Sequence, residues 1–85
     1  MSISDLRDAF NAVSEPRFTC SKAFLDYVRE RNDKLQTVNE YQVLTFFGTS
    51  SDGNTFEQKS PKLSPNTDMA TAARDTAKAL IEGTP

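Results

Sequence analysis

The side chains that could carry out chemistry are few in this chain of 85 residues. Histidine is absent, which removes the side chain most often used for acid–base catalysis near neutral pH and as a metal ligand. Triads of the Ser-His-Asp or Cys-His type are therefore excluded. Catalysis by carboxylates would need a pocket that perturbs their pKa values. A small enzyme of this kind is therefore kept only as an alternative to the two binding functions described below.

Cys20 is the single cysteine, so the chain can form neither an intrachain disulfide nor a multi-thiolate metal site. This cysteine usage favours a reducing, cytoplasmic setting. The thiol is either a reactive group beside a helix start or a small buried apolar side chain, and the sequence favours the second. The glycines form no phosphate-binding loop. We expect no catalytic residue, no cofactor and no metal.

The strongest candidate for a functional surface is a β-hairpin predicted in the second half of the chain. Residues 41–47 are rich in aromatic and β-branched side chains, and Asp52-Gly53 is typical of a two-residue hairpin loop. Such a loop pairs Thr49 with Phe56, and this register decides which side chains share a face. The return strand is expected to run over residues 55–60.

This register predicts two unlike faces for the hairpin. The core face, expected beneath the helices, carries Tyr41, Val43, Phe47 and Phe56. The outer face is more apolar than a solvated face should be, and we predict a protein-interaction surface there, made of Leu44, Phe46, Gln42, Glu57 and Lys59. The alternatives are a cover formed within the chain by residues 35–38 as a third strand, a covering helix, or a second copy in a homodimer. The unpaired hairpin edges also permit strand addition by a partner.

A basic patch is the alternative candidate, with nucleic acid as its ligand. Its members are Arg29, Arg31, Lys34, Lys59 and Lys62. Ten bases and twelve acids give a net charge of −2 and are interleaved along the chain, so composition alone does not indicate nucleic-acid binding.

Part of the predicted element order resembles that of the double-stranded RNA-binding domain, whose last helix begins with a lysine cluster. Here Asn66-Thr67-Asp68 occupies that place, and only Arg74 and Lys78 follow. The phosphate-binding motif is therefore missing, and we do not assign the chain to that family.

The elements that would position these residues form one small α+β domain over residues 1–85. Apolar spacing predicts a helix over residues 3–14, capped by Ser2 with Asp5 and stopped by Pro16. A second helix is expected from Thr19 or Ser21 to about residue 32. These two helices, the hairpin and a C-terminal helix make the order α-α-β-β-α.

The C-terminal helix is predicted to begin at Ser64 or Asn66 and to end at Gly83. It would present Met69, Ala73 and Ala77 to the core. The N-terminus has no signal-peptide pattern, and the chain has no apolar run long enough to cross a membrane.

These observations predict a non-enzymatic protein–protein interaction module in the cytoplasm. Its size suggests an accessory protein of phage, plasmid or bacterial type, acting as an adaptor or as a stoichiometric inhibitor. The nucleic-acid-binding protein and the carboxylate enzyme are the two alternatives.

Overall fold

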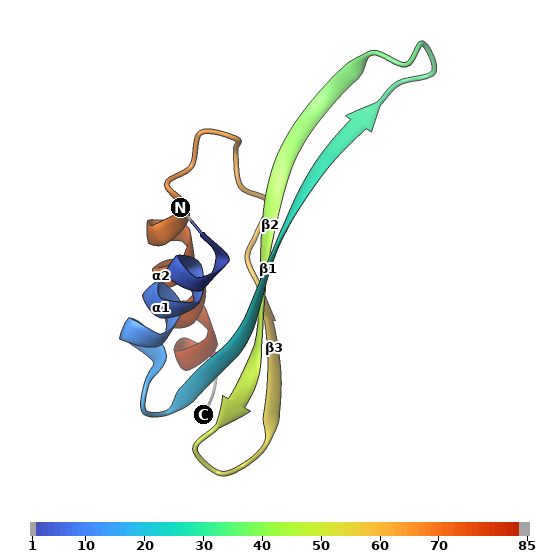
Figure 1. Ribbon diagram of the computed structural model, residues 1–85. Helices are drawn as coiled ribbons and strands as arrows, with labels where there is room; N and C mark the ends of the chain where they lie inside the picture. The colour runs from blue at the N-terminus through green and yellow to red at the C-terminus, as the bar shows by residue number, and fades with distance from the viewer. Residues whose placement is uncertain (1, 84–85) are drawn as a thin grey trace.

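The computed structural model describes residues 2–83 and shows two helices and a three-stranded antiparallel sheet (Figure 1). The elements follow one another as α1 (Ile3–Ser14), β1 (Phe18–Arg31), β2 (Thr37–Ser50), β3 (Thr55–Lys59) and α2 (Met69–Glu82). The predicted α+β class is confirmed, but the order is α-β-β-β-α. Within residues 2–83 neither helix has the length and apolar character needed to span a membrane.

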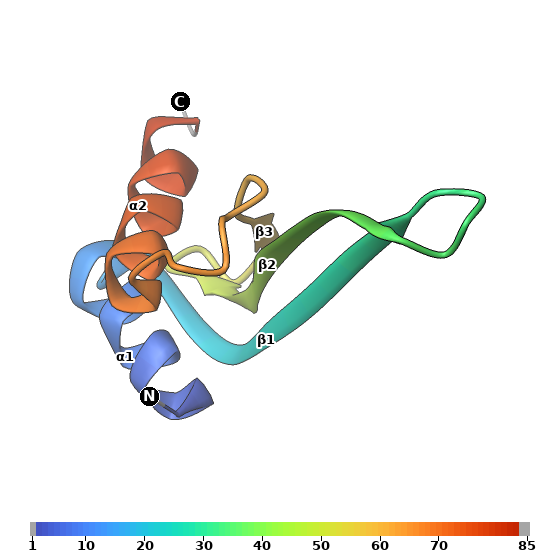
Figure 2. The same ribbon diagram turned by 90° about the horizontal axis from the view of Figure 1, so that it is seen from above.

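The sheet has the order β1-β2-β3, and both helices pack on the same side of it (Figures 1 and 2). The helices cover only one end of the long strands β1 and β2. The other end projects as a two-stranded ribbon, which explains why the molecule measures 50 × 25 × 19 Å (Figure 2). We call residues 25–41 the ribbon and the helix-covered remainder the base. The base holds the hydrophobic core, and no residue of the ribbon is buried.

The first helix confirms the sequence prediction in both its bounds and its capping. The Ser2 hydroxyl accepts a hydrogen bond from the Asp5 backbone N–H at 3.3 Å, and the Asp5 carboxylate accepts one from the Ser2 N–H at 3.0 Å. Leu6 and Phe10 are buried on the face toward the sheet. The helix gives way to extended backbone at Glu15, as Pro16 predicts.

The predicted second helix is wrong, because residues 18–31 form strand β1. The strand alternates at its start, with Phe18 and Cys20 buried, but the next buried residue is Ala23. A bulge between Cys20 and Lys22 adds one residue and turns a spacing of two into a spacing of three. The helix was predicted from Phe24, Tyr27 and Val28, whose spacing is helical, but in β1 Tyr27 lies on the helix side of the sheet and Phe24 and Val28 lie on the other side.

The hairpin between β2 and β3 exists, but its loop is one residue longer than predicted. The Ser50 N–H donates to the Asn54 carbonyl at 2.7 Å, and Gly53 closes the loop with a φ of 90°. A loop of three residues that ends on a glycine in the left-handed region is a standard hairpin connection. Thr49 therefore pairs with Thr55, and Gly48 pairs with Phe56.

The one-residue shift moves Phe56 to the other face and reverses the prediction of which face is the core. Leu44 and Phe46 are fully buried beneath the helices. Phe46 stacks on Phe10 with ring centroids 4.4 Å apart, and Phe10 stacks on Phe56 at 5.9 Å. The prediction that Leu44 and Phe46 lie on an exposed outer face is therefore wrong. A slip of one residue changes the face of every side chain in a strand.

Residues 35–38 do not form a separate third strand, since Leu35 lies in the ribbon turn and β2 begins at Thr37. The third strand of the sheet is β1. The last helix begins at Met69, later than predicted, with Asp68 as its N-cap, and it ends at Gly83 as predicted. Its buried face includes Ala73 and Ala77, which allow α2 to pack closely.

Gly48 allows β1 to approach β2 closely beside the bulge. A Cβ atom at this position would lie 1.9 Å from the Thr19 carbonyl oxygen and 2.8 Å from the Cys20 Cα atom. These are backbone atoms, so they could not move aside without disturbing the sheet. Glycine is therefore required at this position by the packing of the two strands.

Candidate functional site

The five residues predicted as an interaction surface do not share a face. Leu44 and Phe46 lie in the core, and Gln42 is half-buried on the same side of the sheet, where its side-chain amide donates to the Pro65 carbonyl at 3.3 Å. Glu57 and Lys59 lie on the opposite side and form an ion pair at 4.0 Å. The predicted site is therefore divided by the sheet itself.

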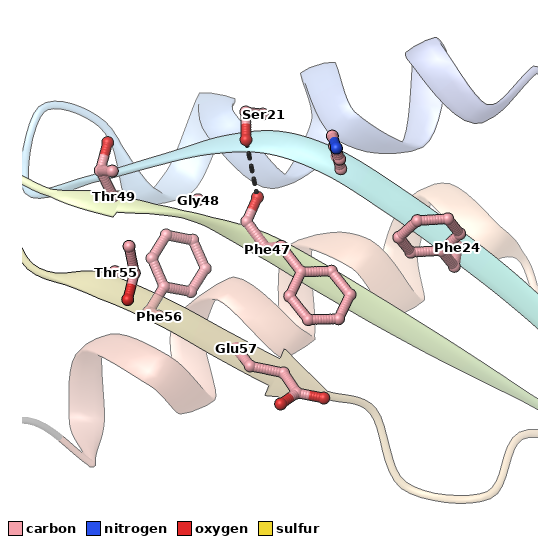
Figure 3. Close-up of a pocket in the computed structure, with 9 residues that line it drawn as sticks. Ser21, Phe24, Phe47, Gly48, Thr49, Thr55, Phe56 and Glu57 are labelled. Carbon is pink, nitrogen blue, oxygen red and sulfur yellow. Dashed lines mark hydrogen bonds between the residues drawn. The ribbon is translucent and has the colours of Figure 1, made fainter.

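The side of the sheet that the helices leave uncovered is apolar along much of its length. We call this side the uncovered face; its apolar members are Phe24, Val28, Tyr41, Val43 and Phe47. Phe24 meets Phe47 edge-on with ring centroids 5.6 Å apart and an interplanar angle of 81°. Both rings project from the sheet on the side away from the helices (Figure 3).

A shallow hollow lies beside these two rings at the end of the sheet opposite the ribbon (Figure 3). Phe47 and Phe24 form its apolar wall, and Ser21 donates a hydrogen bond to the Phe47 carbonyl at 3.3 Å. Lys22 and Glu57 supply one positive and one negative charge at its rim. Phe24 has half of its surface exposed. Paired rings with a charged rim can bind an apolar side chain of a partner.

The ribbon holds its shape through side-chain contacts on both of its faces. On the helix side, the Tyr27 hydroxyl donates to Glu40 at 2.6 Å, and Arg29 pairs with the same carboxylate at 3.5 Å. On the uncovered face, the Lys62 ammonium lies 4.7 Å from the centre of the Tyr41 ring and 3.9 Å from the Glu30 carboxylate. Exposed pairs of this kind contribute little individually, about 0–1 kcal/mol each.

The basic residues of the alternative site are paired with acids rather than gathered into one patch. Arg29, Lys59 and Lys62 each have a carboxylate within 4.0 Å. Arg31 and Lys34 lie at the far end of the ribbon. A phosphate would have to displace an acid from three of these five cations, which weakens electrostatic attraction.

The Cys20 thiol is buried, so the interpretation as a buried apolar side chain is confirmed. Burial raises its pKa, and the thiol donates a hydrogen bond to the Lys22 carbonyl at 3.1 Å. The hollow beside Phe47 contains a single carboxylate, Glu57. Across residues 2–83, acids and Cys20 form no group of three that could hold a metal ion.

Sequence reasoning missed Phe24 because it placed this residue in a helix. The available signal was composition, since Phe18, Phe24, Tyr27 and Val28 all favour strands. Phe47 was recognised as part of a strand but was assigned to the core. The ring pair on the uncovered face was therefore missed for two reasons. Phe24 was predicted to lie in a helix, and Phe47 was predicted to lie on the core face.

Comparisons with protein-family models, with curated proteins and with solved structures find no match to this chain.

Proposed function

We propose that this chain is a non-enzymatic protein-binding module whose partner docks on the uncovered face of the sheet. The observation that carries the proposal is the ring pair of Phe24, which is half-exposed, and Phe47, which is partly exposed, on the face that the helices leave uncovered. The core is complete without them, because Phe10, Phe46 and Phe56 stack on the opposite side. An exposed apolar cluster beside a complete core is typical of an interaction surface.

The partner side chain that fits this place is apolar, because the wall of the hollow is aromatic. Lys22 on β1 and Glu57 on β3 place one positive and one negative charge at the rim of the hollow. Such a rim favours specificity and orientation more than affinity. Binding of this kind suits an adaptor or a stoichiometric inhibitor in the cytoplasm.

The test is an affinity pull-down from the host cell with variants that each replace one apolar side chain by aspartate, either in the ring pair or elsewhere. Phe47→Asp and Phe24→Asp should each lose the partner, because a carboxylate would be desolvated on binding. Val38→Asp is the matched control, since it adds the same charge at an exposed position of the ribbon. Circular dichroism and thermal melting must first show that each variant is folded.

The partner should then be identified by mass spectrometry, purified and bound to the wild-type chain in a two-component titration. Retention of this partner by both phenylalanine variants contradicts the proposal. A low-salt gel-shift with duplex DNA and RNA completes the test, because retardation by the wild-type chain supports nucleic acid as the ligand instead.

A further inference from the structure

The outer edge of β1 presents backbone groups that the sheet does not use. Gln42 and Leu44 in β2 direct their backbone groups toward Leu63 and Ser60, on the side of β3. Neighbouring residues of a strand point their N–H and C=O groups to opposite sides, so Val43, Thr45 and Phe47 face β1. In β1, the backbone groups of Ala23, Leu25, Tyr27 and Arg29 consequently point away from β2.

This open edge has a definite beginning and end. At Cys20 it is closed, because the Asn11 side-chain amide accepts from the Cys20 N–H at 2.7 Å and donates to the Cys20 carbonyl at 3.1 Å. At the other end, the ladder with β2 becomes irregular between Glu30 and Arg31. The open segment therefore runs over residues 22–30, and Asp26 is its midpoint.

Exposed apolar side chains gather along this edge. Ile3, Phe24, Leu25 and Tyr27 are 45%, 50%, 40% and 48% exposed. Phe24 lies on the uncovered face, and Leu25 and Tyr27 lie on the helix side. Ile3, at the start of α1, lines a hollow with Ala23 and Phe24. An open strand edge with apolar residues on both of its faces is a template for strand addition.

We infer that this edge pairs with the same edge of a second copy, so that two antiparallel β1 strands join two sheets into one of six strands. A two-fold axis through Asp26 uses the whole open segment. In this register Phe24 lies opposite the partner's Val28, and Leu25 lies opposite the partner's Tyr27. Lys22 lies opposite the partner's Glu30, so the strand complements itself in charge and in apolar character.

The backbone contribution also favours this register. Each of the four outward-facing residues of β1 pairs with one in the other copy, which forms about eight new backbone hydrogen bonds. A register centred on Phe24 would bring the partner's Val28 against Cys20, where the Asn11 side chain already occupies the edge. Within residues 22–30 of this register, the one like-charge contact is between Asp26 and the partner's Asp26, and this position is exposed.

The inference does not depend on the binding of another protein to the uncovered face. It is tested first by analytical ultracentrifugation of the intact chain over a concentration series. Leu25→Pro removes an outward N–H without removing a hydrogen bond to β2, and it should weaken the dimer by ~10-fold or more. Leu25→Val keeps the N–H and is the matched control. Asp26→Asn should strengthen the dimer because it removes the like-charge contact.

Cysteine cross-linking tests the register directly. Asp26→Cys should form an intermolecular disulfide under mild oxidation, because Cα atoms of such directly opposed residues lie about 4.5 Å apart. Phe24→Cys and Val28→Cys should not cross-link singly, but the double variant should. Wild-type Cys20 is buried and is the background control. A wild-type chain that stays monomeric at all concentrations, or Phe24→Cys cross-linking alone, would falsify the inference.

Discussion

The base and the ribbon are built from the same two strands but are stabilised in different ways. In the base, β1 and β2 bury Cys20, Ala23, Leu44 and Phe46 under the helices. In the ribbon the same strands continue to alternate, yet none of their residues is buried. Strand pairing therefore extends well beyond the core that stabilises it. The contrast separates side chains that hold the fold from side chains that remain available for contacts.

The hairpin turns of the base and of the ribbon also differ, in the residue that adopts a positive φ. In the ribbon turn, the Asn32 N–H donates to the Gln36 carbonyl at 3.1 Å, as Ser50 does to Asn54 in the base. Both turns place their last loop residue in the left-handed region. That residue is Gly53 in the base, but it is Leu35 in the ribbon, with a φ of 61° and 74% exposure. The ribbon therefore contains strain that the base avoids.

The largest expected difference between the two regions comes from truncating an apolar side chain in each. Phe46→Ala should lower the free energy of unfolding by about 3–5 kcal/mol, because it leaves a cavity against Phe10. Val38→Ala in the ribbon should change it by less than about 0.5 kcal/mol. Urea denaturation followed by circular dichroism measures both values. Similar losses for the two variants would show that the ribbon is part of the cooperative core.

A second test adds a methyl group where β1 and β2 come closest. Gly48→Ala should destabilise the chain by about 2 kcal/mol or more, because the new carbon would overlap the Thr19 carbonyl oxygen. Gly83→Ala is a suitable control, since its nearest contact is 3.2 Å away. The same denaturation experiment measures both. A Gly48→Ala variant as stable as the wild type would contradict the close approach at the bulge.

A substitution in the ribbon turn should stabilise the chain locally, whereas the substitution of Gly48 should destabilise it. Leu35→Gly should stabilise the ribbon by up to about 1 kcal/mol, because glycine adopts a positive φ without the Cβ clash of leucine. The gain is local, so amide hydrogen exchange in residues 29–39 should slow while the global unfolding transition changes little. Gly53→Ala in the base is the converse variant and should destabilise its hairpin. Faster exchange in the Leu35→Gly ribbon would contradict the strain.

The smallest effect expected is a loss of stability in acid that comes from three aspartates of the base. Hydrogen bonds from Ser2, Ser50 and Thr71 lower the pKa values of Asp5, Asp52 and Asp68, respectively. A lowered pKa in the folded state gives stability that is present above the ordinary value of 3.8 and is lost as the pH falls through the lowered value. Denaturation between pH 5 and pH 2.5 should show this loss.

The triple variant Asp5→Asn, Asp52→Asn, Asp68→Asn is the comparison for the acid experiment. Its stability should depend less on pH over the same interval, because the three carboxylates no longer titrate. An equally steep dependence in this variant would assign the acid sensitivity to other groups.

Local sequence signals were sufficient for the elements that are stabilised within themselves. Helix α1 combines a capping box with apolar residues at helical spacing, and both signals lie within a few residues of each other. The end of α2 at Gly83 and the strand after Gly53 were predicted for similar reasons. The start of α2 was not, because several residues before it could serve as a cap.

The candidate site was predicted poorly because it depends on pairing between distant residues. Phe24, Tyr27 and Val28 have a helical spacing in the sequence, and only the pairing of β1 with β2 places them on two faces of a strand. One extra residue in the loop before Asn54 shifts the register of β3 and moves Phe56 to the other face of the sheet. The face that was predicted to be the core is therefore the uncovered face. Composition favoured a strand for β1, but neither the pairing of β1 nor the loop length can be derived from local spacing.

By itself the sequence determined a small α+β chain with a capped first helix, a glycine-closed hairpin and no histidine chemistry. Only the tertiary structure decided that Leu44 and Phe46 are core and that Phe24 and the partly buried Phe47 lie on the face that the helices leave uncovered. The physical reason is that strand residues alternate with a period of two. Which set is buried depends on register and on where the helices pack, and both are set by contacts between residues far apart in the chain.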